Sequence, residues 1–187
     1  MTHERIEEIL KSQKIKTFAN LLLSYNKIHN ISGAKNIDDI NENIIDSIYA
    51  LKYFDFVPKS AIDIGSGAGF PAIVLAIALE NCEFTLHEPI AKKSAFLHLV
   101  KNELNLKNVK IETKRVEDSN IHLVELITSR AVGDTKFLID ISKGFYDENT
   151  LFLLYKGSFA KEETKEFSDV KIYERNLRKY VFLKGIK

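Results

Sequence analysis

The residues that could do chemistry are densest between Asp63 and Pro71, where three glycines alternate with small side chains. The apolar run Ala61 to Ile64 precedes them and an apolar segment follows, which predicts a turn from a buried strand into a helix. Glycines in such a turn let backbone N–H groups approach a ligand closely. A dinucleotide fingerprint would place its third glycine where this chain has Phe70.

The glycines stand instead at Gly65, Gly67 and Gly69, a spacing that is typical of methyltransferases that use S-adenosylmethionine. Glu88 supports this interpretation because it ends the next predicted strand, 19 residues after Gly69. A carboxylate in that place can accept hydrogen bonds from two ribose hydroxyls. The alternatives are a glycine-rich turn without a ligand and a solvated acid at a strand end.

Three further candidates follow later strands. After the third predicted strand, backbone groups of Val116 could read an adenine ring and Glu117 could cap the loop. Arg130 lies at the carboxyl end of the fourth predicted strand, the edge at which open α/β sheets bind ligands. Arg130 could face the methionine end of the cofactor or a nucleic-acid phosphate, or form a structural salt bridge.

Three lysines are candidates for contact with substrate phosphate. Lys92 and Lys93 open a predicted helix, where the helix dipole disfavours cations, so they either contact phosphate or are simply solvated. Lys156 follows the fifth predicted strand at the ligand-binding edge of the sheet. Residues 151–187 carry 9 basic and 5 acidic side chains, a net charge of +4 that suits either a polyanion contact or a solvated face.

Several catalytic groups are missing from the sequence. Methyltransferases of exocyclic amines place an Asn/Asp-Pro-Pro-aromatic motif after the fourth strand, where this chain has Ser129-Arg130-Ala131. The single cysteine, Cys82, precedes the second predicted strand and so lies at the opposite edge from the ligands. The five histidines are scattered. We therefore name no catalytic acid, base or nucleophile and expect no metal site.

The elements that must position these residues can be read from periodicity. Helical spacing predicts helices up to residue 57, the third of them with Ile44, Ile45, Ile48 and Leu51 on one face and Asn41 as its N-cap. Beyond Ser60, strands alternate with helices, which predicts a parallel sheet with crossover helices. We expect strands at 61–64, 83–87, 109–112, 123–129 and 150–155, and helices at 73–79, 91–104 and 135–143.

Two final strands, 170–173 and 180–184, follow a charged helix or loop at 160–167 and are expected to form an antiparallel hairpin. The predicted fold is therefore α/β: a Rossmann-like methyltransferase sheet, mostly parallel, with an antiparallel C-terminal hairpin and a short N-terminal helical extension. The expected division is a helical extension at residues 1–57 and a methyltransferase domain at 58–187.

Composition limits the function classes. With 187 residues, 45% hydrophobic residues and a net charge of +1, the chain can bury one sizeable core and is not disordered. One cysteine excludes a disulfide framework. The charged N-terminus does not resemble a secretory signal, and no segment offers the roughly 20 apolar residues of a membrane span. We expect a cytoplasmic monomer with no membrane contact.

In these motifs the chain resembles the bacterial 16S ribosomal RNA guanine-N7 methyltransferases, also called glucose-inhibited division protein B. The resemblance runs from about Leu21 to Lys187. The glycine motif alone indicates a methyltransferase; its combination with three further motifs is specific, namely Phe70-Pro71, Arg115-Val116-Glu117 and Ser129-Arg130-Ala131. Shorter matches are Tyr25-Asn26-Lys27, Asn30-Ile31-Ser32, Ile45-Asp46-Ser47, Lys92-Lys93, Phe96-Leu97 and Lys156-Gly157.

The resemblance implies S-adenosylmethionine as cofactor, small-subunit ribosomal RNA or the ribosomal subunit as partner, and cofactor contacts from Gly65, Phe70, Val116, Glu117 and Arg130. Guanine N7 carries an unshared electron pair and no proton, so its methylation needs alignment rather than a general base. One departure stands out: the family usually has Arg-His where this chain has Glu42-Asn43. The alternatives are a methyltransferase of another RNA, protein or small molecule on the same fold, or a non-catalytic cofactor-binding module.

Overall fold

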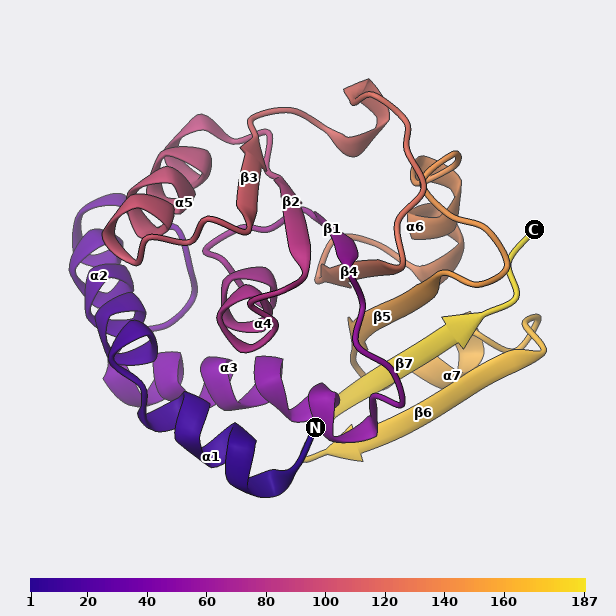
Figure 1. Cartoon of the computed structure of the whole chain (residues 1–187), viewed down its shortest axis with the longest axis horizontal. Helices are drawn as coiled ribbons and strands as arrows, with labels where there is room; N and C mark the ends of the chain where they lie inside the picture. Colours follow the sequence, from indigo (N-terminus) through magenta and orange to yellow (C-terminus); the bar gives the residue numbers. More distant parts are fainter.

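A seven-stranded sheet runs through the centre of the computed structural model, which describes residues 1–187 (Figure 1). Its strand order is β3-β2-β1-β4-β5-β7-β6. All neighbouring pairs are parallel except those that β7 makes with β5 and β6. The strands are β1 Ser60–Ile64, β2 Glu83–His87, β3 Val109–Glu112, β4 Leu126–Arg130, β5 Leu151–Lys156, β6 Asp169–Arg175 and β7 Arg178–Lys184. The predicted fold class, including the antiparallel hairpin, is confirmed.

The strand order reverses direction between β1 and β4, and this reversal places the site. The chain first builds outward from β1 to β2 and β3, and then crosses to add β4 on the other side of β1. Loops that leave β1 and β4 therefore diverge and open a crevice at the carboxyl ends of these strands. Ile64 is in register with Ser129, so Gly65 and Arg130 emerge side by side at that crevice.

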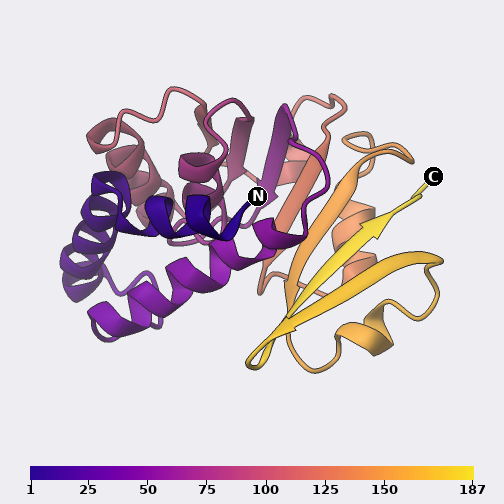
Figure 2. The ribbon, with the colours of Figure 1, turned by 60° about the horizontal axis from the view of Figure 1, so that its bottom comes forward.

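Helices cover both faces of the sheet (Figures 1 and 2). On one face, α1 to α5 share a large apolar core with the sheet; on the other, α6 and α7 cover a smaller one. Figure 2 shows α3 lying between α2 and the hairpin of β6 and β7. The helices are α1 His3–Lys11, α2 Gln13–His29, α3 Ile37–Tyr49, α4 Ala72–Ala78, α5 Ala91–Glu103, α6 Thr135–Ile141 and α7 Ala160–Glu163, with short 3-10 helices at η1 Ala50–Tyr53 and η2 Val116–Asp118.

The predicted N-cap of α3 is wrong. The helix begins at Ile37, and Asn36 is its cap, because the Asn36 side-chain oxygen accepts a hydrogen bond from Asp39 N–H at 2.9 Å. Two acids in the first turn, Asp38 and Asp39, favour this earlier start through the helix dipole. Asn41 is an exposed residue inside the helix. The earlier start matters because it brings Asp39 onto the helix.

Other element ends shift by a few residues. Leu123 is 60% exposed and stands before β4, which begins only at Leu126. The last two strands are longer than expected, and the charged segment at 160–167 contains a single helical turn, α7. None of the helices is both long and apolar enough to cross a lipid bilayer. The division at residue 57 falls between η1 and β1 and stays a prediction, since α1 to α3 share core residues with the sheet.

Candidate active site

The turn after β1 is held in a conformation that suits glycine. Gly65 and Gly67 have φ angles of +69° and +57°, and the N–H groups of Gly65 and Ser66 both donate to the carbonyl oxygen of His87, at 2.9 and 3.1 Å. A Cβ atom on Gly65 would lie 2.5 Å from Cγ2 of Val132. A Cβ atom on Gly67 would have only the carbonyl oxygen of Gly65 near it, at 3.8 Å. Gly65 is therefore packed and Gly67 faces a cavity.

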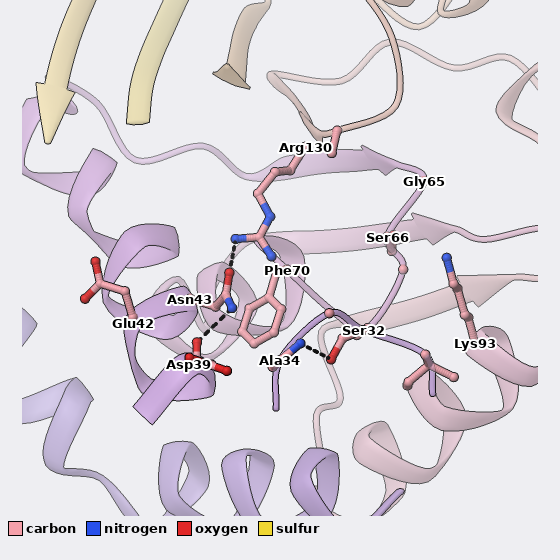
Figure 3. A pocket seen from close by; sticks show the side chains of 15 residues that line it. Ser32, Ala34, Asp39, Glu42, Asn43, Gly65, Ser66, Phe70, Lys93 and Arg130 are labelled. Atoms are coloured by element: carbon pink, nitrogen blue, oxygen red, sulfur yellow. Dashed lines mark hydrogen bonds between the residues drawn. The ribbon is translucent and has the colours of Figure 1, made fainter. Parts of the chain in front are cut away.

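Two cavities meet at Gly65. The first has a volume of about 610 Å³ and is lined by the turn itself, by Phe70, by Lys93 and Arg130, and by the first half of α3 (Figure 3). The second has a volume of about 270 Å³ and is more apolar. Among its lining residues are Val116, Glu117, Val132 and Phe137. The glycine turn thus separates a polar compartment from an apolar one that suits a flat ring.

Glu88 lies beneath the turn rather than in either cavity lining. It is 3% exposed, and its two carboxylate oxygens accept hydrogen bonds from Gly67 N–H at 2.7 Å and Ile90 N–H at 2.9 Å. Each oxygen keeps a second lone pair for a ribose hydroxyl. The structure thus shows a loop-holding role for Glu88, and the ribose contact stays a prediction.

Two buried side-chain polar atoms have no hydrogen-bond partner, and both adjoin the glycine turn. One is Oδ2 of Asp63, whose Oδ1 accepts a hydrogen bond from the Thr128 hydroxyl; the other is Nε2 of His87, in the lining of the second cavity. Burial raises the pKa of Asp63 to about 6 and lowers the pKa of His87 to about 4. Unsatisfied buried polar groups are rare in folded proteins, so this pair marks the glycine turn as a candidate functional site.

Arg130 forms a structural salt bridge and also lines the first cavity, while its contact with a ligand stays a prediction. Its side chain is 14% exposed and lines the first cavity, with the guanidinium carbon 4.9 Å from the centre of the Phe70 ring. It also donates a hydrogen bond to Asn43 Oδ1 at 3.0 Å and lies 3.5 Å from Asp46 Oδ2. A salt bridge therefore fixes a guanidinium that still faces the cavity.

Asp46 connects this arginine to the C-terminal hairpin. The carboxylate is 6% exposed and accepts hydrogen bonds from Nε of Arg178 and the hydroxyl of Tyr180, both at 2.9 Å. Sequence reasoning named Asp46 only as part of a family motif. The available signal was an acid flanked by Ile44 and Ile48, which are buried on the inner face of α3.

Glu42 and Asn43, which stand where the family usually has Arg-His, are part of the cavity wall (Figure 3). Glu42 accepts two hydrogen bonds from the guanidinium of Arg175, and this contact lowers the pKa of Glu42. Asn43 accepts from Arg130. Both residues that differ from the family pattern are therefore hydrogen-bonded to arginines of this chain.

The three predicted phosphate-binding lysines lie in different surroundings. Lys93 lines the first cavity, whereas Lys92 Nζ donates to the carbonyl oxygen of His29 at 3.2 Å on the outer surface. Lys156 is 7% exposed and forms an ion pair with Glu163 at 2.8 Å. A phosphate could reach the Lys156 ammonium only by opening that pair, so the structure gives this side chain an internal partner and its RNA contact stays a prediction.

A family model described as "rRNA small subunit methyltransferase G" (GidB) matches residues 11–187. A ribosomal RNA small subunit methyltransferase G from Campylobacter fetus is 49% identical over 93% of this chain and 94% of its own length. Solved structures share the fold at low identity. A methyltransferase from Geobacter sulfurreducens has a TM-score of 0.67 at 9% identity, covering 91% of this chain and 89% of its own.

Another solved structure with a similar fold is a 16S rRNA N2 G1207 methyltransferase of T. thermophilus in complex with AdoMet and guanosine. Its TM-score is 0.62 at 11% identity, over 83% of this chain and 44% of that one. At this identity the likeness shows a shared fold alone.

Proposed function

The chain belongs to the GidB family of small-subunit ribosomal RNA methyltransferases, and from that premise we propose that it methylates N7 of a guanine in 16S ribosomal RNA. The protein is an S-adenosylmethionine-dependent methyltransferase of ribosomal RNA. The proposal adds the acceptor atom and the residues that hold each ligand. Its test also decides whether the substrate is naked RNA or an assembled subunit.

The observation that carries the proposal is the glycine turn with a polar cavity on one side and a more apolar cavity on the other. His87 lines the apolar cavity, while its unpaired Nε2 and the unpaired Oδ2 of Asp63 are buried beside the turn. The low pKa of His87 keeps this imidazole neutral at pH 7, as contact with an uncharged ring requires. The residues present therefore fit an amino acid joined to an adenosine.

The proposed cofactor contacts follow the two cavities. The adenine would lie in the second cavity between Val116 and Phe137, with Glu117 at its edge. Glu88 would accept the ribose hydroxyls. The turn from Gly65 to Phe70 and the guanidinium of Arg130 would enclose the methionine end in the first cavity.

When bound, S-adenosylmethionine supplies an electrophilic methyl group, whose bond to sulfur breaks with the electron pair going to sulfur as N7 bonds to the carbon. The acceptor loses no proton, and the positive charge passes to the purine. The lining of the first cavity contains no histidine, cysteine or tyrosine, and its acids are Asp39 and Glu42. The residues around the first cavity are thus suited to align two reactants and exclude water.

The RNA would reach the first cavity beside α5. Lys93 at its edge and Lys92 on the adjoining surface are the proposed phosphate contacts, because phosphate neutralisation supplies much of RNA affinity. Lys156 would join them only if its pair with Glu163 opened. We further propose that the protein acts as a monomer in the cytoplasm, where ribosomal subunits are found.

The test is methyl transfer to small ribosomal subunits taken from cells that lack this protein. With tritiated methyl donor, we expect label at one position of 16S ribosomal RNA, and strand cleavage there by borohydride and aniline, which act at N7-methylguanine. Naked 16S RNA run in parallel decides which form is the substrate. Label in protein or metabolites, or in RNA that resists this cleavage, would contradict the proposal.

A further inference from the structure

The acids that line the first cavity both lie on one wall. Lys93 comes from α5 on the side of the glycine turn, whereas Asp39 and Glu42 come from α3, against which the guanidinium of Arg130 also lies through Asn43 (Figure 3). In the figure, α3 and its acids lie on the opposite side of the cavity from Lys93. A ligand whose reacting atom is at the turn therefore presents its far edge to carboxylates.

The two acids differ in the partners they already have. Both oxygens of Glu42 accept hydrogen bonds from Arg175, so this carboxylate is occupied. Oδ2 of Asp39 accepts from the backbone N–H of Lys35 at 2.7 Å, while its Oδ1 has no hydrogen bond and no ion pair. Asp39 is half-buried and lines the cavity. One carboxylate with acceptor capacity is thus fixed on the wall facing the turn.

Guanine has the shape and polarity that this wall fits. Its N7 lies on the imidazole side of the purine, and its N1–H and N2–H groups, two parallel donors, lie on the opposite edge. A carboxylate accepts such a pair of donors, whereas adenine presents an acceptor at N1 and would be repelled. A guanine with N7 directed towards the turn directs its two donors towards α3.

We propose that Asp39 is a specificity-determining residue, which accepts hydrogen bonds from N1–H and N2–H of the target guanine. This inference rests on the proposed function, since it takes N7 as the acceptor atom. It also predicts an effect on kcat. Methylation leaves a positive charge on the purine, so the hydrogen bonds to the carboxylate strengthen as the transition state forms.

The test compares two RNA substrates that differ by one exocyclic group. After the methylated position is mapped with the wild-type protein, small-subunit RNA is prepared by ligation with guanosine or inosine at that position. Inosine keeps N7 and N1–H and lacks the N2 amino group. For the wild-type protein we expect kcat/KM to be about tenfold or more lower for inosine, since a hydrogen bond to a charged acceptor is lost.

The variants Asp39→Asn and Asp39→Ala are then measured on both RNAs. Both should lose about tenfold or more in kcat/KM on guanosine, and their preference for guanosine over inosine should approach one. Asp39→Asn retains an oxygen for Lys35 N–H, which controls for damage to the loop. Asp38→Ala is the matched control, because Asp38 lies beside it in the first turn of α3 and is exposed.

The outcomes separate the two proposals. If the wild-type protein forms no N7-methylguanine, the proposed function fails and this inference fails with it. If it methylates guanosine and both variants keep the full wild-type preference over inosine, or if the wild-type protein has no preference, Asp39 does not read the base. A variant that only raises the KM for S-adenosylmethionine, with the base preference intact, also overturns the inference.

Discussion

Gly67 must adopt a left-handed backbone conformation and leave its outer face open to the first cavity. We expect Gly67→Ala to lower the free energy of unfolding by about 1–2 kcal/mol, the cost of a left-handed residue with a Cβ atom. Gly67→Asp should fold comparably, because aspartate tolerates this conformation better, but its carboxylate would enter the cofactor site. Calorimetry should show at least a tenfold loss of S-adenosylmethionine affinity; an unchanged affinity would remove this turn from the cofactor site.

Glu88 offers a second test at the scale of one side chain. Glu88→Gln keeps an oxygen for one backbone N–H and removes the charge from the proposed ribose contact. Because a hydrogen bond to a charged group contributes about 1.5–3 kcal/mol, cofactor affinity should fall by about tenfold or more. Glu83→Gln, an exposed change at the start of β2, the strand that Glu88 follows, is the control. Equal cofactor affinity in both variants would leave Glu88 only its loop-holding role.

Asp63 makes stability depend on pH in an unusual direction. Its folded pKa of about 6 is above the ordinary value of 3.8 because the carboxyl group is buried, so the folded state holds the proton more tightly than the unfolded state. This contribution to stability is complete below about pH 4 and is lost as the pH rises through 6, a change of about 3 kcal/mol. Asp63→Asn has no carboxyl group to titrate at this position. Its free energy of unfolding, measured with denaturant, should therefore decrease less than that of the wild type between pH 4 and 7. Parallel pH profiles for the two proteins would rule out this origin.

At the scale of elements, Asp46 is expected to hold α3, β4 and β7 together. Removing one partner of a buried ion pair costs about 3–5 kcal/mol, so Asp46→Ala should lower the free energy of unfolding by about that amount. Tyr180→Phe removes one hydrogen bond from the same carboxylate and should cost about 1 kcal/mol. Urea unfolding measures both. Similar small losses in the two variants would mean that the arginines are held by other groups.

The sequence revealed which elements exist better than where they end. The strand Glu83–His87 was predicted to the residue because Phe84 and Leu86 alternate with polar residues, the period of a strand. The start of α3 was missed because the predicted cap is Asn41, whereas the true cap, Asn36, is identified by a hydrogen bond that only the folded helix shows. Leu123 is apolar yet exposed, so hydrophobicity alone extended β4 too far.

At the scale of the whole molecule, RNA binding should depend on salt through the surface around α5. Each phosphate contact adds about 0.7–0.9 to the slope of log affinity against log salt, so Lys92→Glu with Lys93→Glu should reduce that slope by about 1.5. The control is the double variant Lys101→Glu with Lys107→Glu, at and just beyond the C-terminal end of α5. Cofactor affinity should not change in either double variant. An unaltered slope would move the RNA surface away from α5. Lys156 is left out because its exchange would break an internal ion pair.

The candidate site was predictable where its residues are close together in the sequence. The glycine turn could be found in this way because its residues adjoin one another. The side chains on the α3 wall could not, since Asn43 meets Arg130 from 87 residues away and Glu42 meets Arg175 from 133 residues away. Such pairs depend on how the helices pack on the sheet. Asp39 carries no local motif that would distinguish it from its neighbour Asp38.

The position of β7 has a consequence for the order in which the protein can mature on the ribosome. β7 follows every other element in the chain, yet it lies between β5 and β6 in the sheet. It also supplies Arg178 and Tyr180 to the carboxylate of Asp46. While β7 is still inside the exit tunnel, β5 has an open edge, and Arg178 and Tyr180 do not yet contact Asp46. Because β6 pairs only with β7, β6 can join the sheet only together with β7 or after it, although it is synthesised first.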